Sequence, residues 1–194
     1  PHTRWHRDVT FGGAMIVAAS QWLEAQTAGK LPAVASAPSP AGQPTAGAGP
    51  VFLEAFSSHN AVAPGSSFHV ALRISVEKPW HIYAHDQKPG VTVIPTAIRA
   101  FGDGIRSLAE GPFRIGAVKY PPGVSFTDPV LKQPISTYQG QLTLLVPVSV
   151  AQDAAPGDAT LSLELSFQAC DDKSCLVPEK LRLDVKVSIR PGAP

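Results

Sequence analysis

Apolar and polar residues alternate with a period of two along most of the chain beyond residue 50. The clearest runs cover residues 68–76, 142–150, 161–167 and 181–189. Strict alternation of this kind is typical of β-strands that bury one face and expose the other. Turn-forming combinations of Pro, Gly and Asp separate the runs, as at 155–158. The pattern therefore predicts about seven or eight antiparallel strands in an all-β fold, an immunoglobulin-like antiparallel β-sandwich.

The chain before this region has a different composition. Residues 31–50 consist almost entirely of Pro, Ala, Gly, Ser and Thr, so they cannot bury enough apolar surface to offset the entropy of ordering them. We predict a flexible linker there. Residues 1–30 form an N-terminal extension, for which we favour a short helix over the remnant of a signal peptide. The immunoglobulin-like domain is expected at 51–190, with a tail at 191–194.

The composition argues against several classes of protein. The 194 residues include 16 basic and 15 acidic side chains without a basic run, so nothing favours nucleic-acid binding. The longest apolar runs are far shorter than the roughly 20 residues of a membrane helix, which predicts no transmembrane segment in this chain. No phosphate-binding glycine loop, Ser/His/Asp order or paired-carboxylate site stands out.

The two cysteines, Cys170 and Cys175, lie between two alternating runs and are therefore expected at the tip of a hairpin, within bonding distance. A structural disulfide there closes a short loop and contributes only about 2 kcal/mol in the chain-entropy model. A short, exposed disulfide on a turn is also easily reached by another protein's thiolate, which suggests a redox-active pair. The third alternative is a soft-metal site that combines both thiols with one distant histidine.

Charges near the pair act in opposite directions. Lys173 favours a thiolate, whereas Asp171 and Asp172 oppose it, and no helix N-terminus is expected nearby. We therefore expect no strongly acidic cysteine, which suits a carrier of reducing equivalents better than a potent oxidant.

The segment 167–178, FQACDDKSCLVP, resembles the active-site hairpin in the N-terminal domain of DsbD-type thiol:disulfide interchange proteins. Residues 78–83, KPWHIY, resemble the aromatic strand that faces the cysteines in that family. The stretch from 120 through Asp128 to 140 resembles the family's loop and following strand. The resemblance implies an immunoglobulin-like domain in the bacterial periplasm, tethered to the inner membrane in the full-length protein or free of it.

Carried over residue by residue, the resemblance implies that Cys170 and Cys175 are the redox pair of a protein-disulfide reductase. Cys175 is the candidate for the sulfur of the mixed disulfide, although the choice between the two stays open. The surroundings of the pair are expected to include His81, Tyr83, Phe126, Asp128, Val130 and Leu131. Asp128 precedes a proline, so it is either an exposed turn residue or a group that helps proton transfer.

The family shields its disulfide with a cap loop that often carries an aromatic residue at the tip. The matching stretch here, 127–131, has none, and only Phe126 precedes it. Val130 or Leu131 is the alternative cap. The family's motif tyrosine is replaced by Phe167.

Two hypotheses follow from the sequence. In the first, the domain relays electrons from a membrane-embedded thiol-disulfide donor to periplasmic thioredoxin-like oxidoreductases, without a cofactor or a metal. In the second, the chain is a non-enzymatic β-sandwich interaction module whose disulfide is structural. A soft-metal (copper) binding domain remains as a further alternative.

Overall fold

The long alternating runs form the long strands. A computed structural model describes residues 44–100, 111–129 and 132–192. The four longest strands are β4 (Ser67–Val76), β10 (Gly140–Val150), β11 (Gly157–Phe167) and β13 (Glu179–Ile189). Each buries alternate residues, as the sequence pattern predicts. The described residues contain no helix, so the all-β prediction is confirmed.

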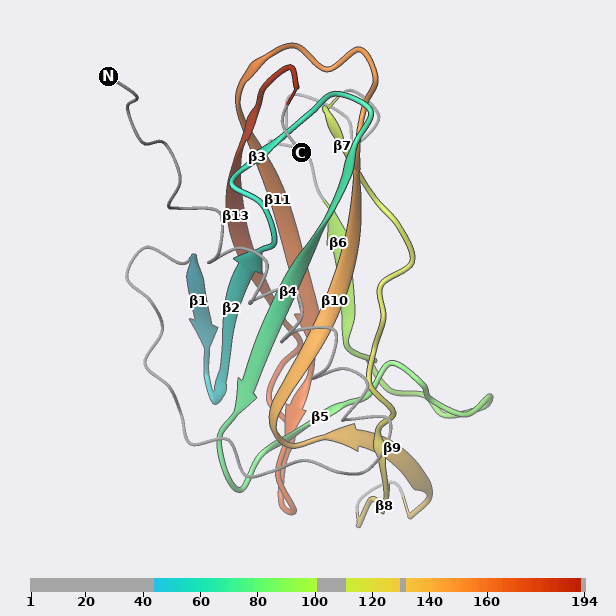
Figure 1. Ribbon diagram of the computed structural model, residues 1–194. Helices are drawn as coiled ribbons and strands as arrows, with labels where there is room; N and C mark the ends of the chain where they lie inside the picture. The colour runs from blue at the N-terminus through green and yellow to red at the C-terminus, as the bar shows by residue number, and fades with distance from the viewer. Residues whose placement is uncertain (1–43, 101–110, 130–131, 193–194) are drawn as a thin grey trace, which may run out of the picture. The chain divides into compact units, whose positions relative to one another are not determined.

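Two sheets pack face to face as an immunoglobulin-like sandwich (Figure 1). One has five strands in the order β1-β2-β4-β10-β7, where β1 is Thr45–Ala48, β2 is Val51–Ser57 and β7 is Phe113–Ile115. The other has four strands in the order β3-β13-β11-β6, where β3 is Ala61–Val62 and β6 is Ala97–Ala100. Neighbouring strands in these two sheets are antiparallel, except β3 with β13.

The space between the two sheets is filled by the inward residues of the long strands. Leu72 lies opposite Leu144 in one sheet, and Leu163 lies opposite Leu183 in the other. Leu72, Leu144 and Leu163 are completely buried. Apolar burial on this scale fixes the register of every long strand, because a slip by one residue would turn these side chains to solvent.

A third, smaller sheet lies at one end of the sandwich, at the bottom of Figure 1. Its strand order is β12-β5-β9-β8, where β12 is Ala169–Cys170, β5 is His81–Tyr83, β9 is Pro134–Tyr138 and β8 is Val124–Thr127. These short strands raise the number of strands to thirteen in the described residues, above the predicted seven or eight. Strands of two to five residues are too short for alternation to reveal them.

The sandwich begins earlier than the sequence predicts. Strand β1 lies inside the stretch that we expected to be linker, and it pairs with β2 from Thr45↔Glu54 to Ala48↔Val51. Ala46 and Ala48 pack against the core. Composition could not reveal this strand because it is held by backbone pairing and by small side chains. The helix expected within residues 1–30 lies outside the described residues.

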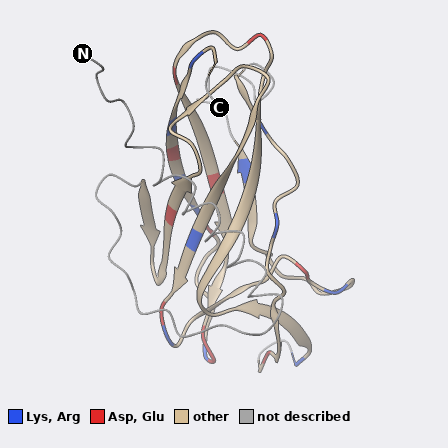
Figure 2. Cartoon of the chain, viewed as in Figure 1, with Lys and Arg blue, Asp and Glu red and all other residues tan. Residues whose placement is uncertain are grey.

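Charged side chains are scattered over the strands and loops without a continuous stretch of one sign (Figure 2). Glu164 forms ion pairs with Lys180 and Arg182 on the neighbouring strand, and Glu54 pairs with Arg73 in the other sheet. In the part of the chain that the structure describes, no helix is long and apolar enough to cross a membrane.

Candidate functional site: a disulfide at the end of the sandwich

Cys170 and Cys175 form a disulfide bond with an S–S distance of 2.08 Å. Backbone hydrogen bonds flank the pair on both sides: Leu176 N–H donates to the Ala169 carbonyl (2.8 Å), and Asp171 N–H donates to the Ser174 carbonyl (2.9 Å). The cysteines therefore occupy a non-hydrogen-bonded position of an antiparallel ladder, where facing Cα atoms come closest. Their Cα atoms are 4.0 Å apart. The predicted hairpin thus brings the two sulfurs together.

The two sulfurs differ in their access to solvent. Cys170 is only 1% exposed, whereas Cys175 lies on the exposed side of the hairpin. The expectation of an exposed disulfide is therefore right for Cys175 and wrong for Cys170. The reason is that Cys170 belongs to β12, whose partner β5 lies in the interior of the small sheet. Another protein can reach this bond through the Cys175 sulfur.

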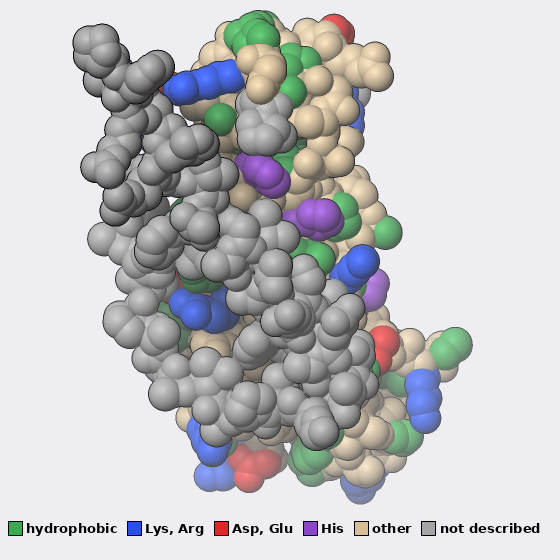
Figure 3. Space-filling model, in the orientation of Figure 1, with side chains coloured by type: hydrophobic (Ala, Val, Ile, Leu, Met, Phe, Trp, Pro, Cys, Tyr) green, Lys and Arg blue, Asp and Glu red, His purple; other side chains and the backbone are tan. Residues whose placement is uncertain are grey.

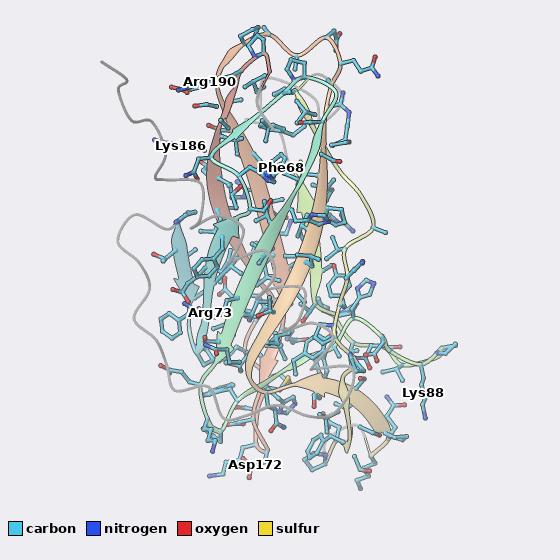
Figure 4. The ribbon with its side chains drawn as sticks, viewed as in Figure 1. Phe68, Arg73, Lys88, Asp172, Lys186 and Arg190 are labelled. Atoms are coloured by element: carbon cyan, nitrogen blue, oxygen red, sulfur yellow. A yellow bond between two sulfur atoms is a disulfide. The ribbon has the colours of Figure 1, made fainter. Side chains whose placement is uncertain are left out.

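Asp171 organises the loop between the cysteines. One oxygen of its carboxylate accepts hydrogen bonds from the backbone N–H groups of Lys173 (2.9 Å) and Ser174 (2.6 Å). Both hydrogen bonds lower the pKa of the Asp171 carboxyl, and the bond from Lys173 has the larger effect. The charge of Asp171 is thus directed at the loop backbone, where it holds the turn that keeps Cys175 facing Cys170. Figure 4 labels the neighbouring Asp172 at the tip of this hairpin.

Basic and acidic side chains (blue and red) lie together at the lower end of the molecule in Figure 3, where Figure 1 shows the tip of the hairpin. Lys173 and Asp172 are both exposed in this loop. The opposing charges that the sequence places beside the cysteines therefore both face solvent.

The hydroxyl of Tyr83 lies against both sulfurs. Its oxygen is 3.2 Å from Cys170 Sγ and 3.6 Å from Cys175 Sγ. Neither sulfur of a disulfide carries a hydrogen, so the hydroxyl is the donor in the oxidised protein. Burial, followed by the nearby charge of Asp128, raises the pKa of Tyr83. The side chain therefore keeps its proton and remains a hydrogen-bond donor across the physiological pH range.

A set of polar contacts fixes the backbone around Tyr83. The Tyr83 carbonyl accepts hydrogen bonds from both the N–H (2.9 Å) and the hydroxyl (2.6 Å) of Thr96. Gln87 donates from its amide to the carbonyls of Ala84 and Ser136, which joins the segment after β5 to β9. Thr96 and Gln87 were not foreseen from the sequence, because nothing local marks them as partners of a strand end.

His81 lies on the same side of the small sheet as the disulfide. It is paired directly with Cys170 in the register of β5 and β12, and it is 4% exposed. Its ring packs edge-on to Tyr83, with centroids 6.1 Å apart, and against Phe126 at 5.5 Å. Burial lowers the pKa of His81, and the charges of Asp128 and Asp171 oppose that shift. The imidazole is therefore neutral at neutral pH.

The part of the small sheet next to the disulfide is buried on both faces. Ile82 and Ala169 join the main core on one face, whereas Tyr83, Cys170 and Ile135 form a separate apolar cluster on the other. Partly buried residues pack against that cluster, namely Val91, Val93 and Phe126. Ile135, Val91 and Val93 escaped the sequence analysis because apolar residues in loops and short strands carry no signal of their own.

The loop that follows β8 contributes Asp128, which is 3% exposed rather than exposed as a turn residue would be. Two hydrogen bonds hold its backbone: the Asp128 N–H donates to the Gln133 carbonyl (3.1 Å), and the Lys132 N–H donates to the Asp128 carbonyl (2.8 Å). The charge of this carboxylate affects both His81 and Tyr83. Val130 and Leu131, expected at the tip of the cap, lie outside the described residues.

In residues 44–100, 111–129 and 132–192, no group of three His, Cys, Asp or Glu side chains is placed to hold a metal ion. Both sulfurs are engaged in the disulfide, so neither is available as a thiolate ligand in this state. His85, the nearest histidine along the chain from His81, instead stacks on Tyr120 with ring centroids 3.9 Å apart.

The fold and the site together define a β-sandwich domain with a disulfide at one end, held between an exposed and a buried cysteine. Comparison with protein families gives a match to the family described as "Thiol:disulfide interchange protein DsbD, N-terminal", over residues 51–186. The match covers most of the chain, and the chain belongs to this family. The resemblance noted in the sequence is thereby confirmed.

Solved structures add only distant similarities. The N-terminal periplasmic domain of ScsB from Proteus mirabilis is 12% identical with a TM-score of 0.44, and the alignment covers 71% of this chain and 48% of that one. The reduced DsbD N-terminal domain from Neisseria meningitidis is 12% identical with a TM-score of 0.39, and the alignment covers 76% of this chain and 90% of that one. A family 123 glycoside hydrolase from Clostridium perfringens is 10% identical with a TM-score of 0.29, and the alignment covers 68% of this chain and 23% of that one. No curated protein matches the chain.

The contacts of Asp171 generate a prediction. Replacing it by alanine (Asp171→Ala) removes the acceptor that holds the turn, so the two thiols of the reduced protein face each other less often. We expect the equilibrium constant for forming the disulfide to fall roughly three- to tenfold, as measured against a dithiol buffer with thiol trapping.

Asp171→Asn is the matched control, because its side-chain oxygen still accepts the two backbone hydrogen bonds while the charge is gone. A value close to that of the wild-type protein is expected for this variant. If Asp171→Asn instead behaved like Asp171→Ala, the charge rather than the turn would be responsible.

Proposed function

We propose that the domain exchanges its disulfide with other proteins in the bacterial periplasm, as a protein-disulfide reductase that relays electrons. A membrane-embedded thiol-disulfide protein is the donor, and thioredoxin-like oxidoreductases are the acceptors. One observation carries the proposal: a disulfide with one exposed sulfur, one buried sulfur and a hydroxyl donor in contact with both. Membership in the interchange family supports it.

The domain is reduced in two exchange steps. A thiolate of the donor attacks Cys175 Sγ, which is the accessible sulfur, and forms a mixed disulfide. The bond between the cysteines breaks, and its electron pair goes to Cys170 Sγ as a thiolate. The second thiolate of the donor then attacks the donor's own sulfur in the mixed disulfide. Cys175 leaves as a thiolate, and the donor becomes a disulfide.

Delivery of the electrons runs the same chemistry in the opposite direction. The Cys175 thiolate attacks the disulfide of the acceptor and forms a mixed disulfide with it. The Cys170 thiolate then attacks Cys175 Sγ, so the disulfide of the domain reforms and the acceptor leaves as a dithiol. The short loop and the facing Cα atoms keep Cys170 within reach of Cys175 throughout.

Tyr83 stabilises the charge that appears on Cys170. A thiolate that is shielded from water is unfavourable unless a hydrogen-bond donor or a positive charge lies next to it. The Tyr83 hydroxyl already points at this sulfur from 3.2 Å, so no rearrangement is needed when the charge forms. Asp128 acts on Tyr83 in the same sense, because its negative charge helps to keep the hydroxyl protonated.

The surface beside Cys175 is suited to contact with another protein. Val177, two residues along the chain, is 72% exposed, and Pro178 is exposed as well. Exposed apolar residues next to a reactive sulfur give a partner something to bury while the mixed disulfide lasts. Phe126 packs against His81 and against the cluster that contains Cys170, so it covers the buried part of the site.

Single-cysteine variants test the assignment of the two sulfurs. In Cys170→Ser the remaining thiol is exposed, whereas in Cys175→Ser it is buried under β5 and the cluster around Tyr83. We expect the thiol of Cys170→Ser to react with iodoacetamide at least roughly tenfold faster than that of Cys175→Ser. Mass spectrometry of timed samples gives both rates.

The same pair of variants tests exchange with a protein. Incubated with a thioredoxin-fold protein that keeps only its attacking cysteine, activated with Ellman's reagent, Cys170→Ser is expected to accumulate a stable mixed disulfide, because neither protein then carries a second thiol that can resolve it. Cys175→Ser should accumulate little. If neither variant formed a mixed disulfide although both were folded, the disulfide would be structural and the chain would be an interaction module.

The hydroxyl of Tyr83 is tested by Tyr83→Phe, which keeps the ring in the apolar cluster and removes the donor. Hydrogen bonds to charged groups contribute about 1.5–3 kcal/mol, so reduction of the disulfide by a small dithiol should slow by roughly tenfold or more. Stopped-flow measurement of the reduction gives the rate.

Tyr138→Phe is the matched control for this experiment. The hydroxyl of Tyr138 donates to the Pro121 carbonyl (2.8 Å), and the described contacts place it in the core cluster rather than in the cluster at the sulfurs. This variant should unfold more easily but exchange at the wild-type rate. Equal slowing of the two variants would mean that general loosening, and not the lost donor, causes the effect.

A further inference from the structure

One buried polar atom near the disulfide has no hydrogen-bond partner. Nε2 of His81 is inaccessible to solvent, and no donor or acceptor lies within hydrogen-bond distance of it. Leaving a buried polar atom unpaired destabilises the folded protein, so its presence at this position calls for a reason. The proposed exchange reaction supplies one, because reduction gives Cys170, which is paired with His81 across the strands, a hydrogen to donate.

His81 and the cysteines form a row across the sheet. Cys170 is paired directly with His81 on one side and with Cys175 on the other. Side chains of directly paired residues project to the same face, with Cβ atoms about 4.5–5.5 Å apart. The His81 ring and the Cys170 sulfur therefore share the face on which Tyr83 also lies. In the disulfide, the sulfur has no hydrogen to offer the imidazole.

We propose that His81 accepts the proton of Cys170 in the step that releases the acceptor, an inference that rests on the proposed function. In the disulfide form Cys170 Sγ makes no hydrogen bond to Nε2. Once the disulfide opens, the Cys170 side chain is free to turn about its Cα–Cβ bond and to donate its hydrogen to Nε2 of the imidazole tautomer that carries its own hydrogen on Nδ1. When the mixed disulfide has formed at Cys175, this proton passes to Nε2. The Cys170 thiolate attacks Cys175 Sγ, the bond to the acceptor breaks, and the acceptor leaves with the electron pair. The imidazolium then returns its proton to the departing thiolate or to water.

The groups around His81 suit this task. Tyr83 lies beside it on β5, Cys170 faces it from β12, Asp171 belongs to the hairpin, and Asp128 follows β8. The two carboxylates favour a positive charge on the ring, whereas burial opposes it. The imidazole is thus neutral and able to accept before the step, and the cation that forms during it is stabilised. Phe126, packed on the ring, adds no titratable group.

The test follows the closing of the disulfide directly. The fully reduced protein is mixed with Ellman's reagent, which forms a mixed disulfide at the accessible Cys175 and releases one coloured thiolate. A second thiolate is released when Cys170 attacks Cys175, so the second phase reports the proposed step. The rate of this phase is measured as a function of pH for the wild-type protein, His81→Gln and His81→Phe. His85→Gln is the control, because His85 is exposed and stacks on Tyr120 instead.

We expect the second phase of both His81 variants to be about a hundredfold slower at neutral pH, the lower end of the range for a positioned general base. At alkaline pH their rates should converge with that of the wild-type protein, because Cys170 then ionises without help. His85→Gln should follow the wild-type profile throughout. Circular dichroism establishes that each variant is folded.

Three results would overturn the inference. The first is a wild-type rate at neutral pH in either folded His81 variant. The second is slowing by the same factor at every pH, which would indicate disturbed packing rather than a missing base. In either case the wild-type protein still releases two thiolates, so the proposed function stands. The third result, release of only one thiolate by the wild-type protein, would overturn both.

Discussion

The site depends on the antiparallel pairing of β11 with β13. Eleven residue pairs, from Gly157↔Ile189 to Phe167↔Glu179, set the register, and the buried leucines on these strands prevent it from slipping. Beyond Phe167 the chain supplies two residues before Cys170, whereas the returning chain supplies three between Cys175 and Glu179. One extra residue on one side, as in a β-bulge, changes the register of the ladder. The two cysteines face each other as a result.

Alternation along the chain also places Cys170 in a different environment from Ala169. Ala169 still contributes to the main core, whereas Cys170 belongs to the small cluster with Tyr83 and Ile135 on the other face. The disulfide is therefore embedded on one side and open on the other. A strong scaffold with its reactive bond at the edge allows one sulfur to be attacked while the other, together with its hydrogen-bond donor, stays in place. The Tyr83 hydroxyl of β5 lies nearer to the sulfur of the buried Cys170 (3.2 Å) than to that of Cys175 (3.6 Å).

Much of this could be predicted from the sequence. The alternation of apolar residues gave β4, β10, β11 and β13, because long strands that bury one face leave a period of two. The hairpin between two such runs placed Cys170 opposite Cys175. The family resemblance then pointed to Tyr83, which the structure places at hydrogen-bond distance from Cys170. These inferences depend on patterns that are local in the chain or preserved in a motif.

The remaining features could not be predicted because they arise from contacts between distant segments. Tyr83 and Cys170 are 87 residues apart, and nothing local shows that β5 lies beside β12. The burial of Asp128, the clamp from Thr96 and the contribution of Ile135 have the same origin. Strand β1 was hidden for another reason: small residues in an edge strand have the composition of a linker.

The reduction potential of the Cys170–Cys175 couple tests most directly whether this disulfide is built for exchange. Equilibration of the domain against defined dithiol buffers, followed by thiol trapping, measures it. A value between roughly −180 and −270 mV, the range of protein thiol carriers, is the result that electron relay requires. A value below about −300 mV would contradict it, because such a bond is structural and would not be reduced by a carrier.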